Sequence, residues 1–243
     1  MRLTAYIDRV IARGVTLEGY RRKSLYNDVV KRALDFVCAL ALLVPMLPVY
    51  GVIALAIRLD SPGPVFYRGV RAGYRGGTFR IFKFRSMVAD AEKRGGGTTA
   101  LGDARITRVG QLLRKTKLDE TPQLLSIIKG DMSFIGPRPE LTRYTDRYQG
   151  AEKIILDVRP GISDISSIHF INLDEIVGGE NADEIYEKQV LAEKNRLRVI
   201  YVLNQSLFFD LCLFLETVIR VFKKAARYLC ARGEAGNGKG QSG

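Results

Sequence analysis

Residues 36–57 read FVCALALLVPMLPVYGVIALAI, and this stretch decides the fold because none of its residues carries a charge. A helix that crosses a bilayer needs about 20 predominantly apolar residues, so we expect residues 36–57 to enter a membrane as a helix. Pro45 and Pro48 lie near the middle, where each removes a backbone donor and clashes with the preceding turn. We therefore expect the helix to kink or reverse at these prolines.

Basic residues flank the apolar stretch on both sides. They are Arg21, Arg22, Lys23, Lys31 and Arg32 before it, and Arg58, Arg68, Arg71 and Arg75 after it. A spanning helix normally has its basic excess at the cytoplasmic end alone. The flanks therefore favour a re-entrant membrane helix over residues 31–58, with both ends at the cytoplasmic face. An ordinary kinked span stays open as the alternative, because membrane helices tolerate proline.

Composition limits the remaining choices. The chain has 243 residues, enough for one sizeable core, and a formal charge of +12, which suits nucleic acid, an anionic lipid surface or phosphorylated substrates. Its three cysteines are far apart and match neither a disulfide framework nor a zinc spacing. With His169 as the single histidine, Ser-His-Asp chemistry and a two-histidine metal site are disfavoured.

A second apolar stretch covers residues 206–230 and is interrupted by Asp210, Glu216 and Arg220. This pattern predicts an amphipathic helix, either at the membrane interface or packed on the soluble core. We divide the chain into a basic N-terminal segment (1–30), the membrane helix (31–58), a central domain (59–205), the amphipathic helix (206–230) and a disordered Gly-rich tail (231–243).

The middle of the chain predicts short strands at residues 65–67 and 78–84, separated by a Gly-rich turn. In the second strand Arg80, Lys83 and Arg85 alternate with apolar residues, which places the basic side chains on or near one face. That face either binds an anion or is simply solvated.

An acidic pair, Asp119-Glu120, follows a run of cations, and Arg138 lies in the rigid turn 136–139. Several cations together commonly hold phosphate groups, and a carboxylate among them stays ionised as a nucleophile or a magnesium ligand. The alternative is structural, with Asp119 capping a helix through residues 123–128 and Glu120 in its first turn.

Several longer motifs occur in series. They are residues 31–35 (KRALD), 60–66 (DSPGPVF), 82–87 (FKFRSM), 103–107 (DARIT), 118–124 (LDETPQL), 129–133 (KGDMS), 136–139 (GPRP) and 159–162 (RPGI). In this order and spacing the chain resembles the bacterial sugar transferases, also called monotopic phosphoglycosyl transferases.

The resemblance implies an α+β, helix-rich fold: a small cytosolic catalytic domain with a re-entrant N-terminal membrane helix hairpin and amphipathic interfacial helices. It implies transfer of a sugar-1-phosphate from a UDP-sugar to undecaprenyl phosphate with release of UMP, at the cytoplasmic face of the bacterial inner membrane. This is the first membrane step in assembling a glycoconjugate such as an exopolysaccharide, capsule, O-antigen or glycoprotein.

For the site, the resemblance implies Asp119 as a nucleophile that forms a phosphosugar-aspartyl intermediate, which is covalent catalysis. Glu120 assists through magnesium or by handling a proton, and Asp119 and Glu120 are the expected Mg²⁺ ligands. The expected phosphate- and substrate-binding cations are Lys83, Arg85, Arg114, Arg138 and Arg159. Anionic membrane lipids are a further expected partner and nucleic acid is not, while a homo-oligomer stays open.

The sequence departs from the family pattern at residues 162–168, which read ISDISSI where many members read Thr-Gly-Trp-Ala-Gln-Val after the glycine. It also has Leu47-Pro48 where the family usually has Ser-Pro at the helix break. The competing hypothesis is a membrane-tethered polyanion-binding or scaffolding protein without catalysis, which the intact acidic pair and its cations disfavour.

Overall fold

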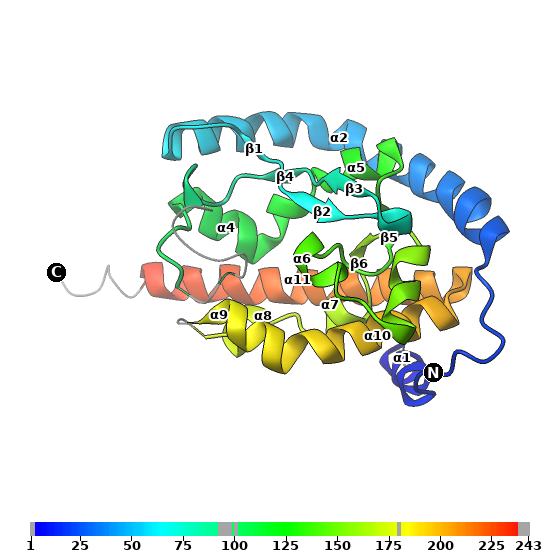
Figure 1. The fold of residues 1–243 in the computed structure, drawn as a ribbon. Coiled ribbons are helices and arrows are strands. Elements are labelled where there is room, and N and C mark those ends of the chain that lie inside the picture. The colour runs from blue at the N-terminus through cyan, green and yellow to red at the C-terminus, as the bar shows by residue number, and fades with distance from the viewer. Residues whose placement is uncertain (1–2, 92–98, 100–101, 179–180, 238–243) are drawn as a thin grey trace.

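The structure is a computed structural model that describes residues 3–91, 99, 102–178 and 181–237 (Figure 1). Helices dominate it, as the sequence predicts. The longer ones are α1 (Leu3–Ala12), α2 (Lys31–Asp60), α4 (Arg108–Thr116), α5 (Gln123–Lys129), α10 (Leu191–Asn204) and α11 (Leu207–Asn237). The shorter ones are α6 (Thr142–Thr145), α7 (Ile165–His169), α8 (Leu173–Ile176) and α9 (Ala182–Ile185).

The strands form small two-stranded sheets among the described residues. The pairs are β1 (Phe66–Tyr67) with β4 (Lys83–Phe84), β2 (Val70–Ala72) with β3 (Thr78–Arg80), and β5 (Ser133–Ile135) with β6 (Gly161–Ser163). The first two pairs are antiparallel and the third is parallel. The strand predicted over residues 78–84 is thus divided between two sheets. Its basic residues consequently point to different places: Arg80 is exposed, whereas Arg85 is buried.

Helix α2 forms over the apolar stretch and stays helical through Pro45 and Pro48. The prolines do not produce a loop between two separate helices, and the helix instead changes direction along its length (Figure 1). Each proline removes one backbone bond, and the ladder on either side is long enough to keep the segment helical.

The first end of α2 is fixed to the globular body by polar contacts. Lys31 pairs with Asp210 of α11, and the guanidinium of Arg32 donates to the carbonyls of Ile127 and Ile128 at the end of α5, at 2.6 and 2.7 Å. This end of the helix therefore lies against α5 and α11.

The last end of α2 is fixed to the same body. Arg85 donates to the carbonyl of Pro62 (2.9 Å) and to the carbonyl of Ser61 (2.6 Å), and Asp60 accepts a hydrogen bond from the main-chain nitrogen of Val109 in α4 (3.0 Å). Both ends of α2 thus rest on one globular unit.

One side of α2 packs on that unit and the other is apolar and exposed. Ala39, Tyr50, Ile53 and Ile57 are buried against β4, α4 and α5. The exposed apolar side chains are Leu34, Phe36, Val37, Leu40, Leu42, Val44, Leu47, Val49, Val52, Leu55 and Leu59. Within the described residues, Tyr26–Asp60 is the one helical segment long and apolar enough to cross a membrane.

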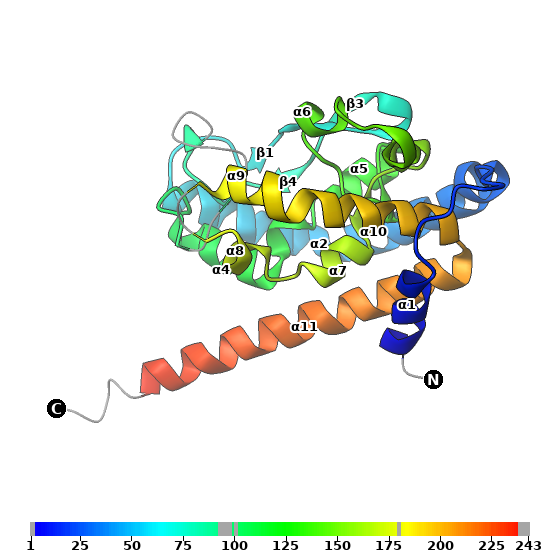
Figure 2. The same cartoon turned by 60° about the horizontal axis from the view of Figure 1, so that its bottom comes forward.

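The largest core lies between α10 and α11, with α1, α7 and β5 packed around it. Phe209 and Leu213 of α11 are fully buried there, while Leu211, Leu215 and Ile219 are exposed. One face of α11 therefore packs on the core, as one of the two alternatives predicts. The other face is apolar and exposed, and its contact with a membrane stays a prediction. Figure 2 shows α11 along the bottom edge of the molecule.

The structure corrects the C-terminal boundary. Helix α11 continues to Asn237, so residues 231–237 are helical where we predicted a disordered tail. Extending an existing helix costs far less than starting one, and this favours continuation into a Gly-containing segment. The rest of the predicted tail, residues 238–243, lies outside the described residues.

Candidate active site

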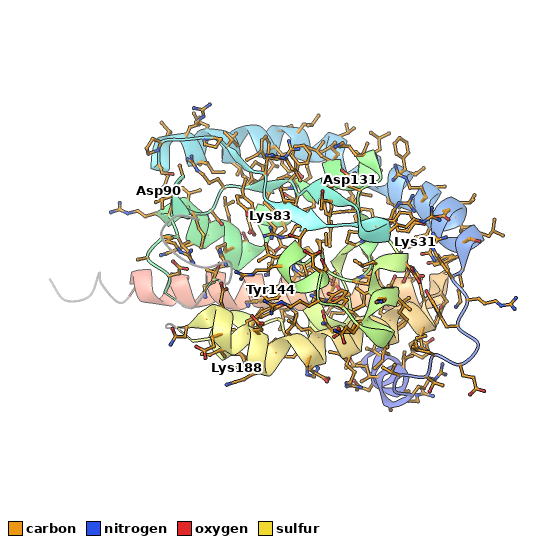
Figure 3. All side chains as sticks on the ribbon, viewed as in Figure 1. Lys31, Lys83, Asp90, Asp131, Tyr144 and Lys188 are labelled. Atoms are coloured by element: carbon orange, nitrogen blue, oxygen red, sulfur yellow. The ribbon has the colours of Figure 1, made fainter. Side chains whose placement is uncertain are left out.

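Glu120 is the centre of a buried charge cluster. Its carboxylate accepts hydrogen bonds from Nζ of Lys83 at 3.1 Å and from both terminal nitrogens of Arg138, one of them at 3.0 Å. Lys83 comes from β4 and lies in the middle of the molecule (Figure 3). Three residues far apart in the sequence, each of them a predicted site residue, therefore meet here.

The cations determine the ionisation of Glu120. Burial alone would raise the pKa of this carboxyl, but Arg138 and Lys83 outweigh burial and hold the pKa well below its usual range. Burial is also the main reason why the pKa of Lys83 is lowered, with the Arg138 charge adding to it and Glu120 opposing it. Glu120 is thus an anion whose oxygens are already used by cations.

Asp119 differs from its neighbour. Its side chain is buried, and its Oδ1 atom has no hydrogen-bond partner among the described residues. Burial and then the charge of Glu120 raise the pKa of Asp119, while Lys83, Lys117 and Arg114 partly offset this rise. A desolvated carboxylate oxygen that no donor holds is available to react or to bind a cation.

The backbone around the pair explains why the two side chains diverge. Residues Leu118–Glu120 form a single 3-10 turn between α4 and α5, and Lys117 before it has a left-handed conformation with φ 60°. A non-glycine residue in this region costs of order 1 kcal/mol or more, and such residues cluster at functional sites. The capping alternative is wrong, since α5 begins after Pro122 and has no side-chain cap.

The turn that carries Arg138 packs closely against Gly161, the first residue of β6. A side-chain carbon at Gly161 would lie 2.1 Å from the nitrogen of Gly136, and one at Gly136 would lie 2.4 Å from the carbonyl oxygen of Arg159. Only glycine allows this approach of two backbones. The guanidinium of Arg138 also donates to the carbonyl of Ile162 at 2.9 Å, so it reaches Glu120 from a fixed base.

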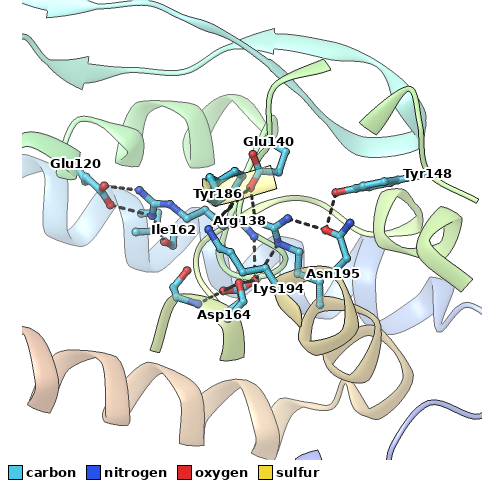
Figure 4. Close-up of polar contacts among 12 residues, drawn as sticks. Glu120, Arg138, Glu140, Tyr148, Ile162, Asp164, Tyr186, Lys194 and Asn195 are labelled. Atoms are coloured by element: carbon cyan, nitrogen blue, oxygen red, sulfur yellow. Dashed lines mark hydrogen bonds and ion pairs between the residues drawn. The ribbon is translucent and has the colours of Figure 1, made fainter. Parts of the chain in front are cut away.

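A second buried network adjoins Arg138 (Figure 4). Arg198 is fully buried and donates to Glu140 at 2.7 Å, and Lys194 lies 4.0 Å from the same carboxylate. Burial would raise the pKa of Glu140, but Arg198 and Lys194 lower it to about 2. Burial and the charge of Arg198 lower the pKa of Lys194 to about 8. The fold therefore contains a charged interior on both sides of Arg138.

Two of the predicted phosphate-binding cations are not part of the cluster. Arg85 is occupied by the carbonyls at the end of α2, as described above. Arg159 donates to the carbonyl of Gly130 at 3.0 Å and contacts Asp28 at 3.3 Å, so it ties α5 to the segment before α2. Both guanidinium groups hold backbone segments together in this structure, and phosphate binding by Arg85 and Arg159 stays a prediction.

Arg114 lies in the last turn of α4 and lowers the pKa of Asp119, which places its charge near the acidic pair. Lys117 acts on both Asp119 and Glu120 in the same way, although we did not assign it to the site. Its place directly before the pair was visible in the sequence. Its left-handed conformation was not, because such a conformation at lysine has no sequence signal.

The acidic pair fits a magnesium ion only in part. Among the described residues no group of three or more Asp, Glu, His or Cys side chains converges on one point. Asp119 has a free oxygen, whereas both oxygens of Glu120 are bound by cations. One carboxylate with substrate phosphates is a usual set of Mg²⁺ ligands, so Asp119 fits this role and Glu120 does not.

The sequence matches the bacterial sugar transferase family over residues 26–224, and the chain belongs to this family. It is therefore a transferase enzyme.

Curated relatives are sugar-phosphate transferases. A UDP-glucose:undecaprenyl-phosphate glucose-1-phosphate transferase of Caulobacter vibrioides is 35% identical over 194 residues, which are 79% of this chain and 69% of that protein. A UDP-N-acetylgalactosamine-undecaprenyl-phosphate N-acetylgalactosaminephosphotransferase of Aeromonas hydrophila is 35% identical over 78% of this chain and 43% of its own length. This chain thus covers less than half of the second relative.

Proposed function

We propose that this protein transfers a sugar-1-phosphate from a UDP-sugar to undecaprenyl phosphate, with Asp119 as the nucleophile. The observation that carries the proposal is the contrast within the acidic pair. Glu120 is bound by two cations, while the buried Oδ1 atom of Asp119 has no partner among the described residues. The names of the relatives support this donor and acceptor.

In the first step a carboxylate oxygen of Asp119 bonds to the β-phosphorus of the UDP-sugar. The bond from that phosphorus to the bridging oxygen breaks, and UMP leaves with the oxygen and its electron pair. Lys83 has three N–H donors and uses one for Glu120, so others remain for the phosphate oxygens. The charges of Lys83 and Arg138 stabilise the negative charge that moves onto the leaving group.

In the second step a phosphate oxygen of undecaprenyl phosphate attacks the same phosphorus. The bond to Asp119 breaks, which frees the carboxylate and leaves the sugar on a lipid diphosphate. Two successive displacements at one carboxylate predict ping-pong kinetics.

Magnesium is part of the proposal, with Asp119 as its protein ligand. When bound, Mg²⁺ would neutralise the charge of the diphosphate oxygens.

We infer that the protein lies on the cytoplasmic face of the bacterial inner membrane with α2 re-entrant. The inference is supported by the anchoring of both ends of α2 on one globular unit and by the exposed apolar sides of α2 and α11. A helix that crossed the bilayer would carry its two ends to opposite surfaces. Anionic lipids would suit Lys223 and Lys224 on α11.

The topology is tested with two variants that each carry a single cysteine, Arg21→Cys before α2 and Arg68→Cys after it, in a background without the native cysteines. Both positions are exposed. In inverted membrane vesicles an impermeant thiol reagent should label both Arg21→Cys and Arg68→Cys, and in right-side-out vesicles neither. Labelling of the two from opposite sides would establish a spanning helix instead.

The reaction is tested by incubating detergent-solubilised protein with a panel of UDP-sugars and Mg²⁺. We expect UMP release that continues only with undecaprenyl phosphate, and without the lipid a single equivalent of UMP with a phosphosugar on the peptide that contains Asp119. Asp119→Asn should abolish both, while the control Asp146→Asn, an exposed aspartate outside the cluster, should retain activity. If no donor gives UMP but polyanions bind tightly and in a salt-sensitive way, the binding-protein hypothesis takes its place.

A further inference from the structure

The segment in which the sequence departs from the family pattern contains a buried acid, Asp164. Its side chain is fully buried, and its Oδ2 atom accepts a hydrogen bond from the main-chain nitrogen of Arg138 at 3.1 Å. Two residues earlier, the carbonyl of Ile162 binds the guanidinium of the same arginine at 2.9 Å. One short segment therefore holds both the backbone and the side chain of Arg138.

Asp164 is itself held rigidly. Its Oδ1 atom accepts from the main-chain nitrogen of Ser167 at 2.6 Å and caps helix α7, and both of its oxygens bond the hydroxyl of Ser166 at 2.8 and 2.9 Å. The hydrogen bonds place the carboxylate with little freedom to move, because a carboxylate that accepts several donors is fixed in direction.

The charge of Asp164 is balanced by Arg198. Nε of Arg198 lies 3.8 Å from Oδ2 of Asp164, and the other end of the guanidinium binds Glu140. Glu140 is two residues after Arg138, so Arg198 connects Asp164 to the segment that carries Arg138 (Figure 4). A buried charge is costly unless it is paired, and Arg198 pairs here with two acids, Asp164, which binds the backbone of Arg138, and Glu140, which follows Arg138 in the chain.

We propose that Asp164 is a positioning residue that sets Arg138 in place to bind Glu120. The proposal rests on the function proposed above for the acidic pair. A bidentate contact depends on the direction of the guanidinium as well as on its charge, so a shift of the turn by a fraction of an ångström weakens it.

The test separates this role from helix capping. Asp164→Ser keeps an oxygen that caps α7 but is too short to reach the nitrogen of Arg138. Asp164→Asn has one acceptor oxygen where Asp164 uses two, so it loses either the cap or the contact with Arg138 and is not a control. We expect Asp164→Ser to lower kcat for UMP release by about 10- to 100-fold with KM for the UDP-sugar changed by less than about threefold. Ser166→Ala removes a partner of Asp164 without touching Arg138, and it should leave kcat unchanged.

A double-mutant cycle between Asp164→Ser and Arg138→Lys then tests the coupling. If Asp164 acts through Arg138, the two losses of kcat combine to less than their product. A wild-type kcat for Asp164→Ser, or a full product in the cycle, would overturn the proposal. The same cycle measured on the unfolding midpoint by circular dichroism needs no activity. Coupling there in a protein that releases no UMP would refute the proposed function and keep the positioning role.

Discussion

Arg138→Met is the perturbation whose cost follows most directly from the structure. It removes a cation that binds both oxygens of Glu120, and breaking a buried ion pair on one side costs about 3–5 kcal/mol. The side chain of Arg138 is 27% exposed, and Lys83 still lies 3.1 Å from Glu120, so we expect the lower figure of about 2–3 kcal/mol. For a chain of this size that corresponds to a midpoint lowered by about 4–12 °C.

The effect should depend on pH in a defined direction. Arg138 and Lys83 depress the pKa of folded Glu120 below its unfolded value. The stability that results is present above the unfolded pKa and is lost as the pH falls through the folded one. The difference between wild type and Arg138→Met should therefore be full at neutral pH and shrink in acid.

Thermal unfolding followed by circular dichroism in detergent measures this difference across the pH range. The matched control is Arg143→Met, which removes a surface pair with Asp183 whose side chains are 48% and 30% exposed, and it should cost less than about 1 kcal/mol. A loss for Arg138→Met that equals the control, or that is the same in acid and at neutral pH, would refute the reasoning.

Two further changes act on the pH dependence of activity, and one acts on stability. Glu120→Gln removes a charge that raises the pKa of Asp119, so the acid limb of kcat/KM should move to lower pH in whatever activity remains. Lys83→Met removes a charge that lowers the pKa of Asp119, so the acid limb of this variant should move to higher pH. If the acid limbs of both variants moved in the same direction, the limb could not be assigned to Asp119. Arg85→Met leaves the carbonyls of Ser61 and Pro62 without their donor and should lower the free energy of unfolding by about 1–3 kcal/mol. KM for the UDP-sugar should stay near that of wild type, and a selective rise in KM would instead make Arg85 a substrate ligand.

The acidic pair and its cations show how far sequence reasoning reaches. The sequence predicted that Asp119, Glu120, Lys83 and Arg138 belong together, and the structure brings them to one cluster. It did not predict that Lys83 and Arg138 bind the carboxylate of Glu120 and leave an oxygen of Asp119 without a partner among the described residues. That division depends on a 3-10 turn entered from a left-handed lysine, and local propensities do not encode it.

Two predicted site arginines lie outside the cluster for a common physical reason. Arg85 and Arg159 were grouped with the site because guanidinium groups near a phosphate enzyme's motifs commonly bind phosphate. The same five donors also suit exposed carbonyls at the ends of helices, and both arginines are used in that way here. Sequence gives the donor but not the nearest acceptor, which is fixed only when distant segments pack.

Helix α2 combines both kinds of outcome in one element. Its apolar run and prolines predicted a long helix that changes direction, since these features depend on neighbouring residues alone, and its entry into a membrane stays a prediction. Its anchoring depends on partners that lie far along the chain, such as Asp210 of α11, which pairs with Lys31. Because Asp210 also accepts from Tyr201 of α10 at 2.8 Å, α2, α10 and α11 share one buried carboxylate. Tyr201 also donates to the carbonyl of Ile135 in β5 at 3.1 Å, so the start of α2 is tied through Asp210 and Tyr201 to the strand that precedes the turn of Arg138.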